Sequence, residues 1–221
     1  MKILLVAATE TEIMPLLEEL HLLSPEPQHL KKARYHNLDV EVLITGVGMT
    51  ATAFYLGQTL VSVCDYALNL GLAGSFNRML ELGDVVQVIE DRFSELGAED
   101  GDSFIPISEM NLGTGGVVHN DRNSENPVIE LIPKVTGITV NTVHGNEKHI
   151  DTVCARFHPY TESMEGAAFL FGCKVADVPC AQLRSVSNYV ERRNRKAWNI
   201  PLAVKTLNQK AIEILNAFAG I

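Results

Sequence analysis

Several features that mark specialised protein classes are missing from this chain of 221 residues. Its 4 cysteines lie far apart without a Cys-x-x-Cys pair, so we expect reduced thiols in a cytoplasmic protein. No segment is long and apolar enough to cross a bilayer, and no small-residue cleavage site follows the first apolar run. Cations are also scarce, because 18 Lys and Arg face 27 Asp and Glu, a net charge of −9. These absences argue against a membrane or a nucleic acid as partner.

Motifs for several common kinds of catalysis are also absent. The 7 histidines show neither His-x-His nor His-Glu-x-x-His spacing, so no metal site is predicted. Neither Gly-x-Ser-x-Gly nor a phosphate-binding P-loop sequence occurs. Residues 46–51 fit the Gly-x-Gly-x-x-Gly/Ala fingerprint of dinucleotide sites, but the acid that should follow the next strand is missing, since Asp65 precedes it. We therefore interpret this run as a tight turn and expect no cofactor.

What the chain does contain is an alternation of strand and helix patterns, with 46% hydrophobic residues to fill a core. Strands are predicted at 3–8, 38–45, 66–70, 84–90, 137–143 and 179–186. Helices are predicted from Thr9, from Gly48 to about 63, at 148–157, up to Val175 and from Asn199 onward. Residues 22–32, 91–126 and 191–196 are interpreted as loops. The pattern predicts one α/β domain over residues 1–221.

Three polar residues lie at the ends of predicted elements, where α/β proteins place chemistry. Glu12 lies in the first turns of the first helix, Glu165 comes where an apolar helix begins, and Asn188 follows the apolar run 181–186. A carboxylate is favoured at a helix start by the helix dipole. Each residue also has an ordinary interpretation: an exposed helix residue, a helix cap and an asparagine that ends a strand.

The joint occurrence of several short segments favours the functional interpretation. These segments are 1–3 with 10–12, Gly46-Val47-Gly48, 69–74, 82–86, Ser163-Met164-Glu165 and 184–188. Together they resemble the nucleoside phosphorylase/nucleosidase superfamily, and within it the methylthioadenosine/adenosylhomocysteine nucleosidases. Residues 187–190, followed by Arg193, Arg195 and Trp198, are most similar to the futalosine hydrolases of the menaquinone route. The resemblance implies a central twisted mixed sheet, partly barrel-like, with flanking helices. It also implies a homodimer or higher homo-oligomer that acts on a small purine nucleoside.

The resemblance assigns a role to each matching residue. Cleavage of an N-glycosidic bond passes through a ribosyl cation, so carboxylates are needed to activate a water and to stabilise positive charge. By resemblance, Glu12 holds the water, Glu165 holds the ribose and Asn188 holds the base. The supporting positions are Met164 beneath the sugar, Ser187 beside the base, Gly74 for close backbone approach, and Arg193, Arg195 and Trp198 for the substrate tail.

One departure from the adenine-specific nucleosidases selects the expected substrate. They carry an aspartate at the position of Asn188, whereas an amide NH₂ can donate to N7 and O6 of a 6-oxopurine. We therefore expect hydrolysis of futalosine with release of hypoxanthine. The phosphorylase branch carries an arginine near the position of Asn69, so phosphate is not expected to take part. The alternatives are an adenine-releasing methylthioadenosine/adenosylhomocysteine or aminofutalosine nucleosidase, a phosphorylase, and a non-catalytic nucleoside-binding protein of the same fold.

Overall fold

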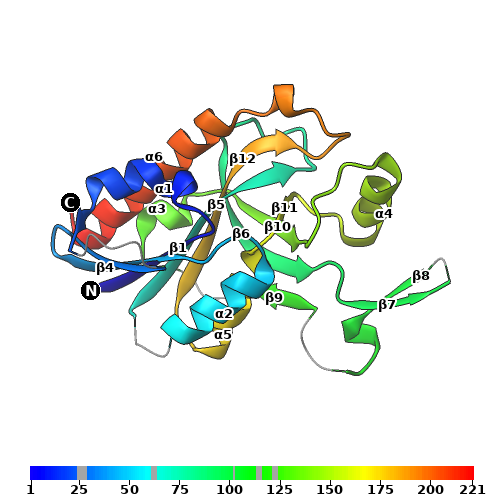
Figure 1. The fold of residues 1–221 in the computed structure, drawn as a ribbon, viewed down its shortest axis with the longest axis horizontal. Coiled ribbons are helices and arrows are strands. Elements are labelled where there is room, and N and C mark those ends of the chain that lie inside the picture. Colours follow the sequence, from blue (N-terminus) through cyan, green and yellow to red (C-terminus); the bar gives the residue numbers. More distant parts are fainter. Residues whose placement is uncertain (24–28, 61–63, 102, 113–115, 121–123) are drawn as a thin grey trace.

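A mixed sheet runs through the computed structural model, which describes residues 1–221 except 24–28, 61–63, 102, 113–115 and 121–123 (Figure 1). Its strands are β1 (Lys2–Ala7), β2 (His21–Leu22), β3 (Leu30–Tyr35), β4 (Leu38–Ile44), β5 (Tyr66–Ser75), β6 (Val85–Phe93), β9 (Val117–His119), β10 (Lys134–Thr139), β11 (Thr161–Ser163) and β12 (Cys180–Tyr189). A separate hairpin consists of β7 (Gly97–Asp100) and β8 (Ser103–Pro106). The main order is β11-β10-β6-β12-β5-β1-β4-β3-β2, and β9 pairs with β6.

Part of this sheet closes on itself. β11 pairs in parallel with β10 and antiparallel with β5, where Glu162 lies opposite Gly74. The strands β5, β12, β6, β10 and β11 therefore form a ring, while β1, β4, β3 and β2 extend from β5 as an open sheet. Strands β1, β4, β5 and β12 run parallel and are mostly buried, although β12 carries the buried polar residues Gln182, Arg184 and Ser185 among its apolar ones. This arrangement confirms the predicted α/β class with a partly barrel-like mixed sheet.

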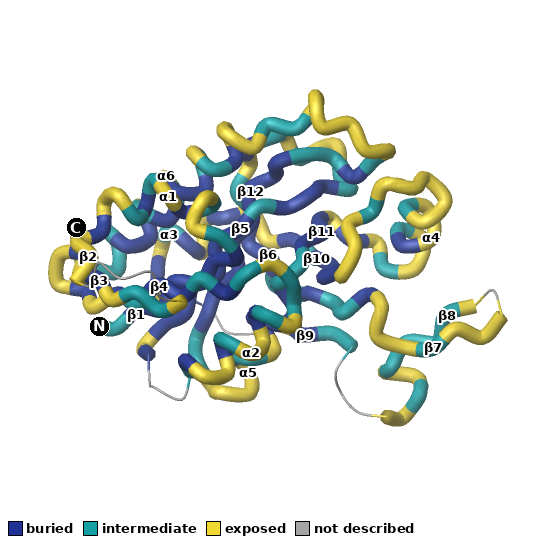
Figure 2. Tube along the Cα trace, viewed as in Figure 1, coloured by how far each residue is buried: buried dark blue, intermediate teal, exposed yellow. Residues whose placement is uncertain are grey.

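Helices cover both faces of the open part of the sheet. The helices are α1 (Glu10–Glu19), α2 (Met49–Thr59), α3 (Pro127–Glu130), α4 (Glu147–Phe157), α5 (Gly166–Val175) and α6 (Ile200–Ala219), with short 3-10 turns at 107–109 and 195–197. One core cluster lies between the sheet and α1, α3 and α6, and a second lies under α2 and α5. Figures 1 and 2 show these two layers, with α4 and the β7–β8 hairpin at the far end of the molecule. No helix in the described ranges is long and apolar enough to span a membrane.

Several predicted boundaries are wrong, and the reasons are physical. β5 and β12 both continue past the predicted ends, so Asn188 lies within a strand, because pairing with β5 satisfies its backbone. The predicted loop at 22–32 contains the start of β3, and the strand predicted to reach residue 143 ends at Thr139. Residues 91–126 are not merely surface loop, since Asp91 is completely buried in β6 and β9 adds to the sheet. Helix α2 ends at Thr59, and residues 61–63 lie outside the described part.

Candidate active site

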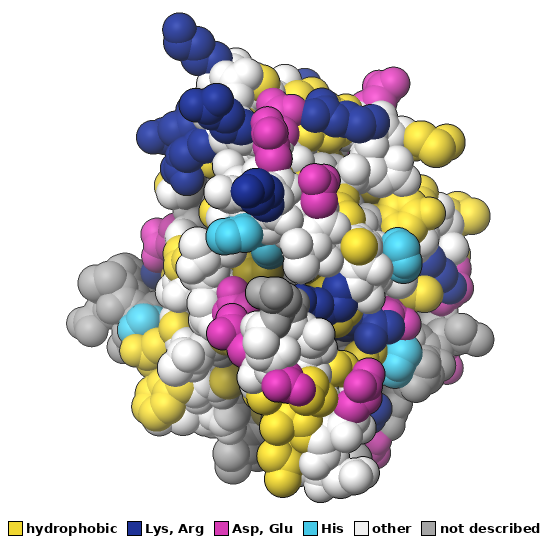
Figure 3. Space-filling view, turned by 90° about the vertical axis from the view of Figure 1, so that its right-hand side faces the viewer, with side chains coloured by type: hydrophobic (Ala, Val, Ile, Leu, Met, Phe, Trp, Pro, Cys, Tyr) yellow, Lys and Arg dark blue, Asp and Glu magenta, His cyan; other side chains and the backbone are white. Residues whose placement is uncertain are grey.

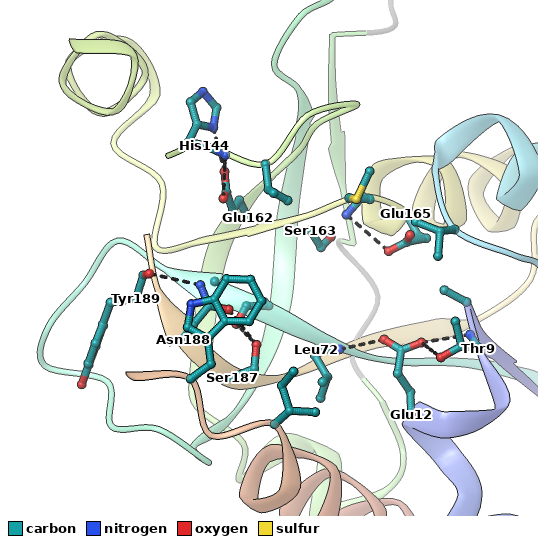
Figure 4. Close-up of a pocket in the computed structure, with 18 of the residues that line it drawn as sticks. Thr9, Glu12, Leu72, His144, Glu162, Ser163, Glu165, Ser187, Asn188 and Tyr189 are labelled. Atoms are coloured by element: carbon teal, nitrogen blue, oxygen red, sulfur yellow. Dashed lines mark hydrogen bonds and ion pairs between the residues drawn. The ribbon is translucent and has the colours of Figure 1, made fainter. Parts of the chain in front are cut away.

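A cavity of about 400 Å³ lies at the carboxyl ends of the parallel strands β1, β5 and β12, beside β11. Open parallel sheets generally bind ligands at this edge. Residues from segments far apart in the sequence line it: Ala8, Thr9, Thr11, Glu12, Val47, Leu72, Ala73, Gly74, Val143, His144, Gly145, Glu162, Ser163, Met164, Glu165, Ser187, Asn188, Tyr189, Glu191, Arg193, Trp198, Ile200 and Val204. Figure 4 shows how the polar ones face the same space. The structure thus brings together all the predicted site residues except Arg195.

Glu12 is held at the start of α1 by three donors. Its Oε2 accepts from Thr9 N at 2.9 Å and from Thr9 Oγ1 at 3.0 Å, and its Oε1 accepts from Leu72 N at 3.3 Å. The helix kinks just beyond it, because Ile13 has non-helical angles and Pro15 lies inside. The buried Asn208 of α6 bridges the kink, donating to Glu12 O at 2.8 Å and accepting from Leu16 N at 3.0 Å. Glu12 is therefore fixed on two elements, and its carboxylate faces the cavity (Figure 4).

Glu165 lies just before α5 and is also held by main-chain donors. Its Oε1 accepts from Gly48 N at 2.9 Å, and its Oε2 accepts from Met164 N at 3.3 Å. Gly48 has φ +101°, a conformation that strongly favours glycine, so the turn at 46–48 serves to aim this N–H. Burial raises the pKa of Glu165 and the nearby Glu12 adds to the shift, while Arg184 and the two N–H groups oppose it.

A buried arginine lies beneath the two carboxylates. Arg184 of β12 is 1% exposed. Its guanidinium and the Glu12 carboxylate both lie next to Gly71: a Cβ built on this glycine would be 3.3 Å from Arg184 Nη1 and 3.5 Å from Glu12 Oε1. Its Nη2 donates to Asn69 Oδ1 at 2.6 Å. Burial lowers the pKa of Arg184, and Glu165, Asp91 and Glu12 counteract this shift. Asn69 itself carries no charge, but a cation, Arg184, lies beside it and interacts with the carboxylates of Glu165, Asp91 and Glu12.

Asn188 occupies the opposite end of the cavity. Its Oδ1 accepts from Ser187 Oγ at 2.9 Å, and its Nδ2 donates to Tyr189 O at 3.1 Å. A register shift between Val186 and Asn188 allows Ser187 and Asn188 to line the cavity together. One of the two amide hydrogens is thus engaged within the protein, which leaves one for a ligand. The prediction that both hydrogens serve the base does not match this geometry.

Gly74 and Met164 lie where the resemblance implied. A Cβ on Gly74 would lie 2.9 Å from Val190 Cγ2 and 3.2 Å from Asn188 Nδ2, so a side chain at this position would collide with its neighbours. Met164 lines the cavity next to Glu165 and packs against a small apolar cluster under α4. Both residues therefore set the shape of the cavity, one by leaving space and the other by filling it.

The residues predicted to hold a substrate tail lie in the segment between β12 and α6. Arg193 and Trp198 line the cavity, and Arg193 Cζ lies 5.3 Å from the centre of the Trp198 ring. Arg195 does not line the cavity, although its Cζ lies 5.9 Å from the same ring. Both arginines are exposed, and Figure 3 shows a concentration of Lys and Arg side chains on this side of the molecule.

Several lining residues were missed from the sequence. Glu162 is 4% exposed and accepts from the imidazole Nδ1 of His144 at 2.7 Å, and Ser163 Oγ is buried without a hydrogen-bond partner among the described residues. A signal was present in the run Thr161-Glu162-Ser163, since acidic and hydroxyl residues rarely occupy a buried strand without a function. Nothing in the sequence places His144 beside Glu162, because their contact depends on the fold. No cluster of metal-binding side chains occurs among the residues described.

Comparison with known proteins gives a consistent result. The profile of the family described as Phosphorylase superfamily matches residues 2–219. The chain is 32% identical over 220 residues to a futalosine hydrolase of Acidothermus cellulolyticus, covering 93% of this chain and 87% of that one. It is 25% identical over 206 residues to an aminodeoxyfutalosine nucleosidase of Helicobacter pylori, covering 87% of both chains. Among solved structures, the methylthioadenosine/adenosylhomocysteine nucleosidase of Colwellia psychrerythraea in complex with adenine superposes with a TM-score of 0.81 at 21% identity, covering 98% and 95%.

Proposed function

Since the chain belongs to the Phosphorylase superfamily, we propose that it is a nucleosidase that hydrolyses futalosine and releases hypoxanthine, as a step of menaquinone biosynthesis. The observation that carries this proposal is the arrangement of the cavity. Two carboxylates, Glu12 and Glu165, lie at one end, and the donor amide of Asn188 lies at the other. A ribosyl cation needs negative charge on its sugar side, and the leaving purine needs a donor.

Each carboxylate has a role that follows from its contacts. Glu12 accepts from fixed donors but keeps lone pairs toward the cavity, so it can orient a water and take its proton as the water attacks the anomeric carbon. Glu165 lies close enough to Arg184 and Glu12 to interact with both, and it holds the ribose hydroxyls and stabilises the developing positive charge. The remaining N–H of Asn188 donates to N7 of the departing base.

The same geometry supports water rather than phosphate as the nucleophile. The only buried cation near this end in the described part of the chain, Arg184, is already faced by Glu12, Glu165 and Asp91. Asn69, near the position where the resemblance places an arginine in the phosphorylases, accepts from Arg184 and donates to Val6 O. A phosphate dianion would therefore meet more negative than positive charge here. Hydrolysis is expected to yield the free sugar at the same rate with and without phosphate.

We also propose a homodimer or larger homo-oligomer. Apolar side chains are exposed on α2 and α5, where Phe54, Phe171 and Val175 are 59%, 47% and 71% exposed. A shallow depression lined almost entirely by apolar residues of these two helices lies between them. Such a face is typical of an interface between copies. Light scattering of the purified protein measures its mass in solution.

The experiment that tests the proposed function compares substrates directly. The protein is incubated with futalosine, inosine and methylthioadenosine, each with and without phosphate, and the released base and sugar are identified. Release of hypoxanthine from futalosine without ribose 1-phosphate supports the proposal. Preferential release of adenine would favour an aminofutalosine or methylthioadenosine/adenosylhomocysteine nucleosidase. A phosphorylated sugar would indicate a phosphorylase, and binding without any cleavage would indicate a nucleoside-binding protein.

A further inference from the structure

The buried carboxylate of Glu162 has no role in the chemistry described above, although it lines the cavity. It accepts from His144 N at 3.1 and 3.4 Å and from His144 Nδ1 at 2.7 Å. An ionised carboxylate offers about four lone-pair sites, so two donors leave capacity for a third. Figure 4 shows the carboxylate between His144 and the cavity.

The sheet register places Glu162 next to the base end of the site. Gly74 of β5 pairs with Glu162 of β11 on one side and with Asn188 of β12 on the other. A Cβ on Gly74 would lie 3.2 Å from Asn188 Nδ2 and 3.5 Å from Glu162 Cγ, so both side chains lie on the same face. The backbones of Glu162 and Asn188 are therefore about two strand spacings apart, roughly 10 Å, and their side chains converge over Gly74 beside Val190, so an acceptor and a donor face the cavity on either side of the glycine.

A 6-oxopurine matches this row better than a 6-aminopurine. The 6-oxopurine has an acceptor at N7 and a donor at N1–H, whereas the 6-aminopurine has acceptors at both N7 and N1. Asn188 has one free amide hydrogen and can serve N7 of either base, so it discriminates poorly by itself. A carboxylate opposite N1 accepts from N1–H but faces a lone pair on the amino base. The amino group reaches that carboxylate only if the ring slides away from Asn188.

We infer that Glu162 is a specificity-determining residue that selects 6-oxopurines by accepting their N1–H, with His144 as the positioning residue that orients it. The inference rests on the proposed function for the identity of the leaving base. The competing explanation is that Glu162 only anchors the segment between β10 and α4 through His144. Glu95 offers a matched control, because it anchors the same segment through Asn141 N at 3.3 Å and Asn141 Nδ2 at 2.7 Å without lining this cavity.

The test measures binding of free bases by calorimetry, which needs no turnover. Hypoxanthine, 1-methylhypoxanthine and adenine are titrated into the native protein, Glu162→Gln and Glu95→Gln, with thermal unfolding to confirm that the variants fold. The native protein should bind hypoxanthine about ten- to a hundredfold more tightly than the methylated base, as expected for a charge-assisted hydrogen bond. In Glu162→Gln we expect the amide oxygen to accept from His144 N, as the carboxylate does, so that the amide NH₂ points toward the base. The preference for hypoxanthine over adenine should therefore collapse or reverse, whereas Glu95→Gln should keep it.

The outcomes separate this inference from the proposed function. Equal affinity of the native protein for hypoxanthine and its 1-methyl derivative would overturn the role of Glu162, even if futalosine is cleaved. The same holds if Glu95→Gln reproduces the loss seen in Glu162→Gln. A preference for N1–H that disappears only in Glu162→Gln supports the inference. If futalosine is not cleaved in that case, the proposed reaction fails while the selection of the base stands.

Discussion

The two ends of the cavity hold their polar groups by different means. At one end, Glu12 and Glu165 are fixed mainly by main-chain N–H groups, which belong to the turns after β1 and β4, to β5 itself and to Met164 after β11. At the other end, side-chain donors contribute to the orientation of the polar groups: the imidazole of His144 donates to Glu162, and the hydroxyl of Ser187 donates to Asn188. Every residue except proline supplies a main-chain N–H, although the conformation at Gly48 also favours glycine, whereas side-chain donors are lost with single substitutions. The chemistry of the cavity thus depends on the fold, and the choice of base depends on a few replaceable residues.

The largest effect is expected at the end held by the main chain. Glu12→Gln can keep its bond to Thr9 N and should leave the fold intact, but it should lower turnover by about a hundredfold or more through loss of the general base. The measurement is kcat with futalosine. The control is Glu10→Gln, a neighbour whose carboxylate is half exposed and pairs with Lys31, for which near-native turnover is expected. Near-native turnover in Glu12→Gln would show that Glu12 is an ordinary helix residue.

The next effect concerns the end held by side chains. Asn188→Asp brings a carboxylate oxygen against Tyr189 O and removes the donor for N7, so activity on futalosine should fall and the preference should move toward the 6-amino analogue. A buried mismatch of this kind costs about 1–3 kcal/mol, or roughly ten- to a hundredfold in relative kcat/KM. Asn146→Asp is the control, since either residue caps α4. Native activity of Asn188→Asp on futalosine would remove Asn188 from this role.

A smaller effect is expected where the site meets solvent. Arg193→Ala should raise KM for futalosine by a few-fold and leave inosine unaffected, because an exposed cation contributes about 0.2–1 kcal/mol to binding of a carboxylated tail. Arg195→Ala should have a weaker effect, since this residue does not line the cavity. Arg192→Ala, another exposed cation of the same segment, serves as the control. If both variants keep the native preference for futalosine over inosine, the tail is held elsewhere.

Beneath the cavity, at Asp91, the expected effect is on stability and not on turnover. Burial raises the pKa of Asp91 to about 6 from 3.8, although Gln182 Nε2 and Thr139 Oγ1 donate to it at 2.8 and 2.9 Å. The folded protein therefore binds a proton that the unfolded chain has lost, and this group's contribution to stability falls as pH rises from about 4 to 6. Asp91→Asn should remove about 1 kcal/mol of the change in unfolding free energy between pH 5 and pH 8, measured with urea. An identical pH profile in both proteins would contradict this assignment.

The sequence predicts more of the fold than of the site. Mostly apolar runs identify β1 and β5, because strands buried on both faces are rich in apolar residues, and Asn199 followed by Pro201 marks the start of α6. Strand ends are predicted poorly, since the pairing that extends β12 to Tyr189 is a tertiary interaction. The site contacts depend on register in the same way. No local pattern brings Glu162 opposite Gly74 or inserts Asn208 into the kink of α1.

The closure of the ring slows the opening of the strands around the cavity. A strand of three residues at a free edge would fray, but β11 is paired on both sides, with β10 and with β5. Its amide hydrogens should exchange with heavy water as slowly as those of the long central strands, because exchange requires the ring itself to open. Because both sides of β11 are paired, its backbone groups are not available for pairing with a strand of another chain. The base end of the cavity is thus kept in shape by topology, before any ligand arrives.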